Sequence, residues 1–134
     1  MVRLEQAVLI ASASALSWLL MSAVHEFGHV LGAVSTGGTV ERIVLHPLAI
    51  SRTDVRPNPQ PLIVVWSGPI VGIAVPLAAV AVCRRLYRVV RDLVSFFAGA
   101  CLIANGLYLG VGSFYLIGDA GELLRHGAAA WHLW

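Results

Sequence analysis

The chain has 134 residues, of which 58% are hydrophobic and 12% are charged, and its formal net charge is +2. Soluble domains carry charge on about 25% of their residues, so this composition excludes an ordinary soluble domain and indicates a protein embedded in a bilayer. The basic residues fall at the ends of apolar runs without interleaved aromatic residues, which excludes a nucleic-acid-binding surface. We expect an integral, multi-pass membrane protein with one membrane-embedded domain over residues 1–134.

An apolar run over residues 7–34 is the first predicted span, since about 20 apolar residues cross a bilayer. The motif His-Glu-Phe-Gly-His lies toward its end, at residues 25–29. Residues four apart share a helix face, so His25 and His29 direct imidazole nitrogens at one point, with Glu26 about 100° round the helix. Each ionisable side chain costs about 2.5–3.5 kcal/mol at the centre of a span, and a divalent cation compensates that cost. The pattern predicts a metal site, and a polar cluster without metal is the alternative.

The segment after the first span is predicted to lie at the membrane surface. Gly37-Gly38 ends the helix, and residues 39–55 are rich in β-branched residues and interrupted by Pro47, which predicts a short β-hairpin-like segment. Its edge could hold an unwound peptide through backbone hydrogen bonds, and a plain surface connector is the alternative. Residues 56–61 contain alternating prolines, so we expect an extended return to the membrane.

Residues 62–83 form the second predicted span. Pro69 and Pro76 lie inside it, and we expect them to break the helical hydrogen-bond ladder. Broken backbone at membrane depth is tolerated where it faces protein or a water-filled cavity. Gly68-Pro69 is therefore a candidate cavity wall that contacts substrate, with an ordinary proline kink as the alternative.

A basic connector over residues 84–92 leads to the third predicted span, residues 93–117. Asn105 lies in the middle of this span and needs a polar partner there, which is either another helix or a bound substrate. The predicted fold is an all-α membrane protein, with three transmembrane helices and a short β-hairpin-like segment between the first and second.

Each predicted span contains two glycines four residues apart. Small residues at this spacing let helix backbones approach closely, so we expect these faces to pack against one another around residues 25–29. The pairs are Gly28 and Gly32, Gly68 and Gly72, and Gly106 and Gly110.

The third apolar run stops at an acidic segment. Catalytic zinc typically has three protein ligands and keeps a fourth position for water. Asp119 is the best candidate for the third ligand, and Glu122 is the alternative. Glu26 would then take a proton from water and pass it to the leaving amine. The tail, residues 123–134, ends in tryptophans that suit a membrane interface, or it begins a fourth span.

These motifs resemble those of the site-2 protease-type intramembrane zinc metalloproteases, over about residues 7–124. The resemblance implies that His25, His29 and Asp119 ligate Zn²⁺ and that Glu26 is the general base. It also implies that the segment between the first two spans guides substrate. Residues 35–61 and the tail would face the cytosol; the arginines are distributed too evenly to decide this orientation.

Two positions depart from the pattern of the family that the chain resembles. Gly72 stands three residues after Pro69, where the family often has Asn. Asp119 is followed by Ala120, where the family usually has Gly.

We therefore expect an intramembrane zinc metalloprotease that hydrolyses peptide bonds of membrane-associated protein or peptide substrates within the lipid bilayer. The first alternative is a non-catalytic membrane scaffold, related to such proteases, that binds metal or substrate helices. The second is a small transporter or channel component. The second alternative predicts that no third ligand converges on His25 and His29.

Overall fold

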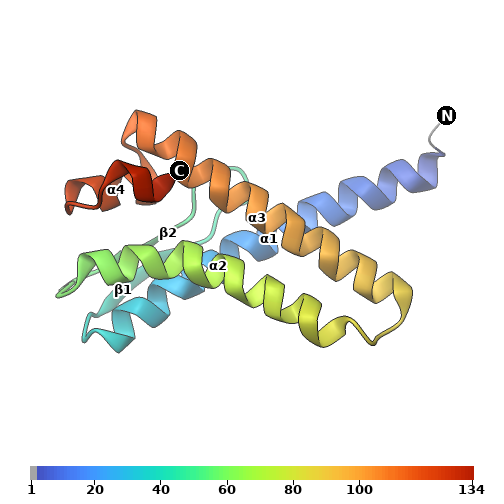
Figure 1. Cartoon of the computed structure of the whole chain (residues 1–134), viewed down its shortest axis with the longest axis horizontal. Coiled ribbons are helices and arrows are strands. Elements are labelled where there is room, and N and C mark those ends of the chain that lie inside the picture. The colour runs from blue at the N-terminus through green and yellow to red at the C-terminus, as the bar shows by residue number, and fades with distance from the viewer. Residues whose placement is uncertain (1–2) are drawn as a thin grey trace.

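The computed structural model describes residues 3–134 and has the expected order of elements (Figure 1). Long helices carry most of the chain, and a two-stranded hairpin separates the first from the second, which confirms the predicted fold class. The elements are α1 (Leu4–Ser35), β1 (Val40–Val44), β2 (Arg52–Val55), α2 (Pro61–Cys83), α3 (Arg88–Tyr115), α4 (Gly118–Arg125) and a final 3₁₀ helix, η1 (Ala130–Leu133).

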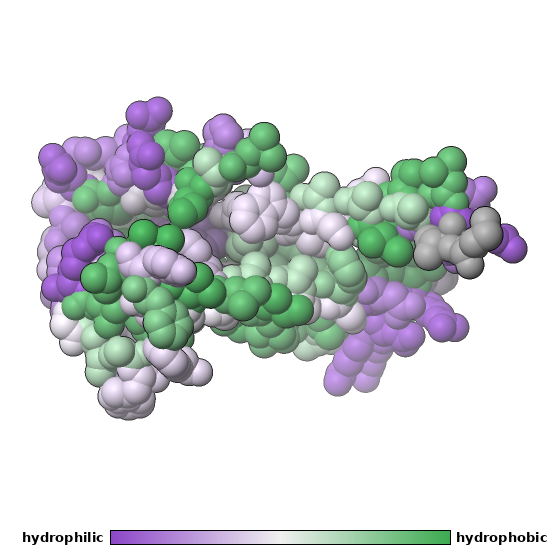
Figure 2. Space-filling model, turned by 90° about the horizontal axis from the view of Figure 1, so that it is seen from above, coloured by the Kyte–Doolittle hydropathy of each residue, from purple (hydrophilic) through white to green (hydrophobic). Residues whose placement is uncertain are grey.

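Within residues 3–134, three helices are long and apolar enough to cross a membrane: α1, α2 and α3, with 32, 23 and 28 residues. At about 1.5 Å per residue the shortest reaches about 34 Å, enough for a hydrocarbon core of about 30 Å. Figure 2 shows apolar surface across the middle of the molecule and hydrophilic residues gathered at its two ends. This distribution is that of a multi-pass integral membrane protein, as expected.

Helix α3 begins earlier than the predicted third span. It starts at Arg88, so much of the predicted connector over residues 84–92 is helical. Arg88 and Asp92 are one turn apart, with Nε and Oδ2 separated by 3.6 Å, and such pairs support the first turn of a helix. The predicted third span starts at the first apolar residue, Leu93, and leaves out this polar turn.

The prolines of the second span remove hydrogen bonds from the helical ladder, as expected, but they do not interrupt the helix. Helix α2 is continuous from Pro61 to Cys83, although Pro69 and Pro76 lie inside it. Each proline lacks the N–H that would bond the carbonyl four residues earlier, so each removes one hydrogen bond. Both proline side chains are fully buried. Their packing inside the protein holds the helix together across these two positions.

Helices α1 and α2 approach each other through their glycines. A Cβ on Gly28 would overlap the backbone carbonyl of Ser67, and a Cβ on Gly32 would overlap the Ser67 side chain. The contact places the second half of α1 against α2, whereas the N-terminal end of α1 projects away from the other helices (Figure 1). The predicted close approach therefore holds for these two helices.

The predicted packing of the third glycine pair is wrong. A Cβ added to Gly106 or Gly110 would meet no atom of residues 3–134 within 4 Å, leaving out neighbours on its own helix. Helix α3 uses another face, on which Asn105 packs against Gly72 of α2. The spacing of glycines in the sequence does not specify which face of a helix turns inward.

The hairpin confirms the predicted β segment and is attached to α1. β1 and β2 pair antiparallel, with Val40 opposite Val55 and Val44 opposite Arg52. The indole Nε1 of Trp18 donates a hydrogen bond to the Pro47 carbonyl oxygen in the connecting loop, over 2.9 Å. The hairpin is thereby held over the side of α1 that carries the ionisable motif.

The tail folds back onto the helices. Leu116 ends α3 with φ 55°, Gly118 also has φ 55°, and α4 begins there. Helix α4 has 8 residues, too few to cross a bilayer. The tail instead packs through a buried apolar cluster formed by Ala120, Leu123 and Leu133.

We expect Gly28→Ala to destabilise the protein by about 1–3 kcal/mol, because the added methyl group forces the α1 and α2 backbones apart. Gly106→Ala is the matched control, since its methyl group meets open space and alanine favours the helix. Thermal unfolding in detergent should show a lower midpoint for Gly28→Ala and an equal or higher midpoint for Gly106→Ala. Equal midpoints for the two variants would contradict close α1–α2 packing.

Candidate metal centre

Two histidines on α1 and an aspartate on α4 converge at one point. His25 and His29 are one helical turn apart, and their ring centroids are 4.9 Å from each other. The Oδ2 atom of Asp119 lies 2.7 Å from Nε2 of His25 and 3.4 Å from Nε2 of His29. The helical spacing thus brings both rings to the same carboxylate oxygen.

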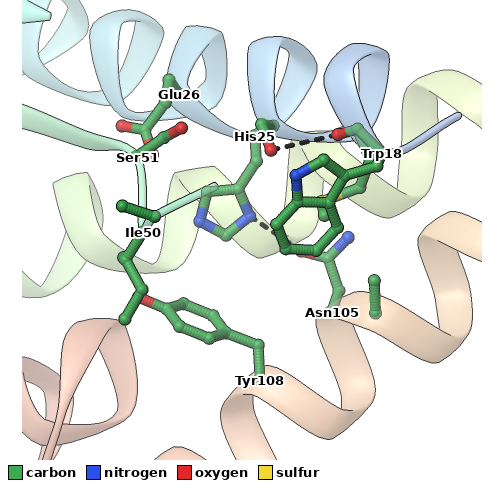
Figure 3. Close-up of a pocket in the computed structure, with 11 residues that line it drawn as sticks. Trp18, His25, Glu26, Ile50, Ser51, Asn105 and Tyr108 are labelled. Carbon is green, nitrogen blue, oxygen red and sulfur yellow. Dashed lines mark hydrogen bonds between the residues drawn. The ribbon is translucent and has the colours of Figure 1, made fainter. Parts of the chain in front are cut away.

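The other nitrogen of each ring faces a fixed hydrogen-bond acceptor. Nδ1 of His29 donates to the backbone carbonyl of Val64 on α2, over 2.8 Å. Nδ1 of His25 is 2.8 Å from Oδ1 of Asn105 on α3 (Figure 3). Nδ2 of Asn105 in turn donates to the Cys101 carbonyl. Since the Asn105 amide donates through nitrogen, its oxygen is the acceptor for the His25 ring. Both rings are therefore protonated at Nδ1, which leaves Nε2 available toward Asp119.

Asp119 reaches the histidines because the turn after α3 reverses the chain. Gly118 precedes it with positive φ, and a Cβ at this glycine would overlap the Tyr108 hydroxyl. Burial raises the pKa of Asp119, but hydrogen bonds and charge from His25 and His29 outweigh it and lower that pKa to about 2. The carboxylate is therefore ionised throughout the neutral range.

Glu122, the alternative third ligand, lies elsewhere. Its carboxylate pairs with Arg125 in the next turn of α4 and lies 3.6 Å from Nε2 of His126. These partners lie on the exposed side of α4, whereas Asp119 points inward. The structure thus brings Asp119, and not Glu122, to His25 and His29.

Glu26 lies beside the two histidines but has a separate partner. One of its carboxylate oxygens is within 4.8 Å of a ring nitrogen of each histidine, and all three residues are buried. Its Oε2 accepts a hydrogen bond of 2.7 Å from the Thr53 hydroxyl on β2. Sequence reasoning missed Thr53, because a threonine in a short strand carries no signal of a contact with a helix 27 residues earlier.

Gly68 and Pro69 form the surface of α2 against which the histidines pack. A Cβ on Gly68 would overlap the His29 ring and come within 2.9 Å of Nε2 of His25. Pro69, the next residue, is fully buried. Both residues thus lie at the centre of the protein. The predicted substrate contacts of Gly68, Pro69 and Asn105 stay predictions.

The converging atoms fit a divalent metal. Protons on Nε2 make the hydrogen bonds with the Asp119 carboxylate, and a divalent cation would take their place. Neutral rings protonated at Nδ1 would then present two Nε2 lone pairs, and Asp119 a carboxylate, to that cation. Tetrahedral zinc at about 2.0–2.1 Å from each ligand needs ligand atoms about 3.3 Å apart. The His29–Asp119 distance meets this value, and the His25–Asp119 distance needs to widen by about 0.6 Å.

A cavity of about 940 Å³ gives access to these residues from one side. Glu26, His29 and Asp119 line it, and so do the residues of β2. Tyr108 also lines it, beside the His25 ring, with ring centroids 5.9 Å apart. Sequence reasoning missed Tyr108 as well, although its place three residues after Asn105 puts it on the same face of α3.

We expect Asn105→Ala to weaken zinc binding about 10–100-fold, because the His25 ring loses the acceptor that fixes its orientation. The measurement is competition with a chromogenic chelator for zinc bound to protein in detergent. Ser95→Ala is the control, since the Ser95 hydroxyl bonds only the Arg91 carbonyl of its own helix among the described contacts. Unchanged affinity in Asn105→Ala would show that His25 does not depend on this hydrogen bond.

Comparison with known proteins gives one match. No curated protein and no solved structure matches the chain significantly. The model of the family described as Peptidase M50B-like matches residues 6–110, most of the chain, including α1 with its two histidines and ending before Asp119. M50 peptidases are zinc metalloproteases, and the buried group of His25, Glu26 and His29 can hold a metal ion. The match and the membrane-spanning helices together establish that the chain belongs to the site-2 protease family of membrane-embedded peptidases.

Proposed function

We propose that this protein is an intramembrane zinc endopeptidase that hydrolyses peptide bonds of membrane-associated proteins or peptides. One observation carries the proposal: Nε2 of His25 and His29 and Oδ2 of Asp119 converge beside the buried carboxylate of Glu26. Family membership supports a protease-type role. A transporter or channel component is expected to have no third ligand near the two histidines, whereas Asp119 lies next to both of them.

Each residue has a role in this hydrolysis. His25, His29 and Asp119 would hold zinc, which supplies Lewis acidity that activates water and polarises the scissile carbonyl. Glu26 takes one proton from the attacking water as the oxygen bonds to the carbonyl carbon. It then gives a proton to the leaving nitrogen as the C–N bond breaks. Water is consumed, and a carboxyl group and an amine are released.

The hairpin suits the delivery of an extended substrate segment. Residues 50–55, which include β2, line the same cavity as Glu26 and His29. A strand edge binds an extended peptide through backbone hydrogen bonds. A substrate helix must unwind before its peptide bond reaches Glu26, and pairing with β2 would stabilise the unwound segment. This placement supports the hairpin as the substrate guide.

Purified protein should contain about one zinc ion per chain by metal analysis. We expect His25→Ala and Asp119→Ala to lose zinc, because each removes one ligand. Glu26→Gln should keep zinc but lose cleavage of a quenched fluorescent transmembrane peptide with an unwound Gly-Pro segment. Glu122→Gln is the control and should keep both properties. If the wild-type protein binds zinc but cleaves no peptide, the non-catalytic scaffold is favoured. If the wild-type protein contains no zinc, the proposal of a zinc enzyme is overturned.

Thr53→Val should lower kcat about 10–100-fold, since a hydrogen bond to a charged group contributes about 1.5–3 kcal/mol and this one orients Glu26. Zinc content should not change, because Thr53 contacts Glu26 and not the converging ligand atoms. Thr53→Ser keeps the hydroxyl and should restore kcat. A change confined to KM would instead indicate that Thr53 acts only through the hairpin's contact with substrate.

A further inference from the structure

A second, smaller cavity lies beside His25 and Glu26, lined by residues of α1, α3 and the hairpin loop (Figure 3). Its volume is about 90 Å³. We propose that it is a specificity pocket that takes an aliphatic side chain of the substrate next to the scissile bond. This inference rests on the proposed peptidase function and adds to it the class of residue at the cleavage site.

The walls of this pocket are apolar. Figure 3 shows the Trp18 indole and Ile50 among the residues around the His25 ring. The apolar lining comes from α1, the hairpin loop and α3: Trp18, Met21, Ala49, Ile50 and Ala104. An occupant therefore gains free energy by burying apolar surface here.

Most polar side chains in the walls already form hydrogen bonds with other groups of the protein. The Ser22 hydroxyl donates to the Trp18 carbonyl, and the Ser51 hydroxyl accepts from the His46 backbone N–H. Nδ1 of His25 and both ends of the Asn105 amide are also hydrogen-bonded. A buried water needs two to four polar partners, so this cavity holds water poorly and favours an apolar group.

The size of the pocket selects among apolar side chains. An apolar cavity of about 150 Å³ binds benzene. At about 90 Å³ this cavity is too small for an aromatic ring and suits a branched aliphatic chain. Ala104 contributes to this size, because a larger residue on α3 would extend into the space.

Two features indicate that the occupant of this pocket is a substrate side chain next to the scissile bond. His25 and Glu26 line this small cavity, and Glu26 also lines the larger cavity along β2. A peptide held along β2 can therefore place one side chain in the small cavity while its backbone lies at Glu26. The Trp18–Pro47 hydrogen bond joins α1 to the loop that supplies Ala49 and Ile50, so it holds the outer wall in place.

The test uses three peptide hydroxamates that share one backbone and differ only in a side chain: methyl, isobutyl or naphthylmethyl. The hydroxamate group binds zinc, so the measurement needs no knowledge of the natural substrate. Dissociation constants are measured by thermal shift of the zinc-loaded protein in detergent. We expect the isobutyl compound to bind at least about tenfold more tightly than the methyl compound, and the naphthylmethyl compound to show no such gain.

Variants locate the effect in the pocket. Ala104→Leu should remove the isobutyl advantage and leave methyl binding unchanged. Ala78→Leu is the matched control, since Ala78 is exposed on α2 and lines none of the described cavities. It should leave all three constants unchanged. Should Ala104→Leu fail to fold, Met21→Ala enlarges the same pocket and should strengthen binding of the naphthylmethyl compound.

The outcomes distinguish a failure of the proposed pocket from a failure of the proposed peptidase function. Equal affinity for the three compounds, or unchanged selectivity in both pocket variants, would overturn the pocket alone; a lipid chain in the cavity would give this result. Failure of all three compounds, together with protein that contains no zinc, would overturn the peptidase and the pocket with it.

Discussion

The contact between two histidine rings and the bare backbone of Gly68 is the constraint on which the rest of the structure depends. A methyl group at this position would occupy the volume of the His29 ring and press on His25. Because α2 has no side chain there, α1 lies close enough for Nδ1 of His29 to reach the Val64 carbonyl. The same approach puts Gly28 against Ser67. Helix packing and ring orientation therefore have a single cause.

Every ionisable group at this centre has a partner, as membrane depth requires. An isolated charge in a span costs several kcal/mol, and a buried polar group without a hydrogen bond is also unfavourable. His25 has Asn105, His29 has Val64, and Glu26 has Thr53. Asp119 has both histidine rings. These partners come from α2, α3, β2 and α4, so the position of the motif depends on the whole fold.

In the proposed peptidase, the hairpin would connect substrate binding to Glu26 through two contacts. Thr53 on β2 bonds the Glu26 carboxylate, and the loop before β2 accepts a hydrogen bond from Trp18. The larger cavity lies along β2, and the smaller one lies under the loop. A peptide paired with the hairpin would thus have its backbone and one side chain positioned by the segment that also bonds Glu26.

The sequence by itself determined the features that depend on local periodicity and composition. Hydropathy and length located three spans, and the four-residue spacing of His25 and His29 put both rings on one face. Chain order pointed to Asp119 at the end of the third span. Only the tertiary structure decided how each helix is rotated about its axis, because that rotation follows from packing against distant residues. It turned Gly106 outward, kept α2 continuous through buried prolines, and brought Asn105 and Thr53 to the residues of the α1 motif.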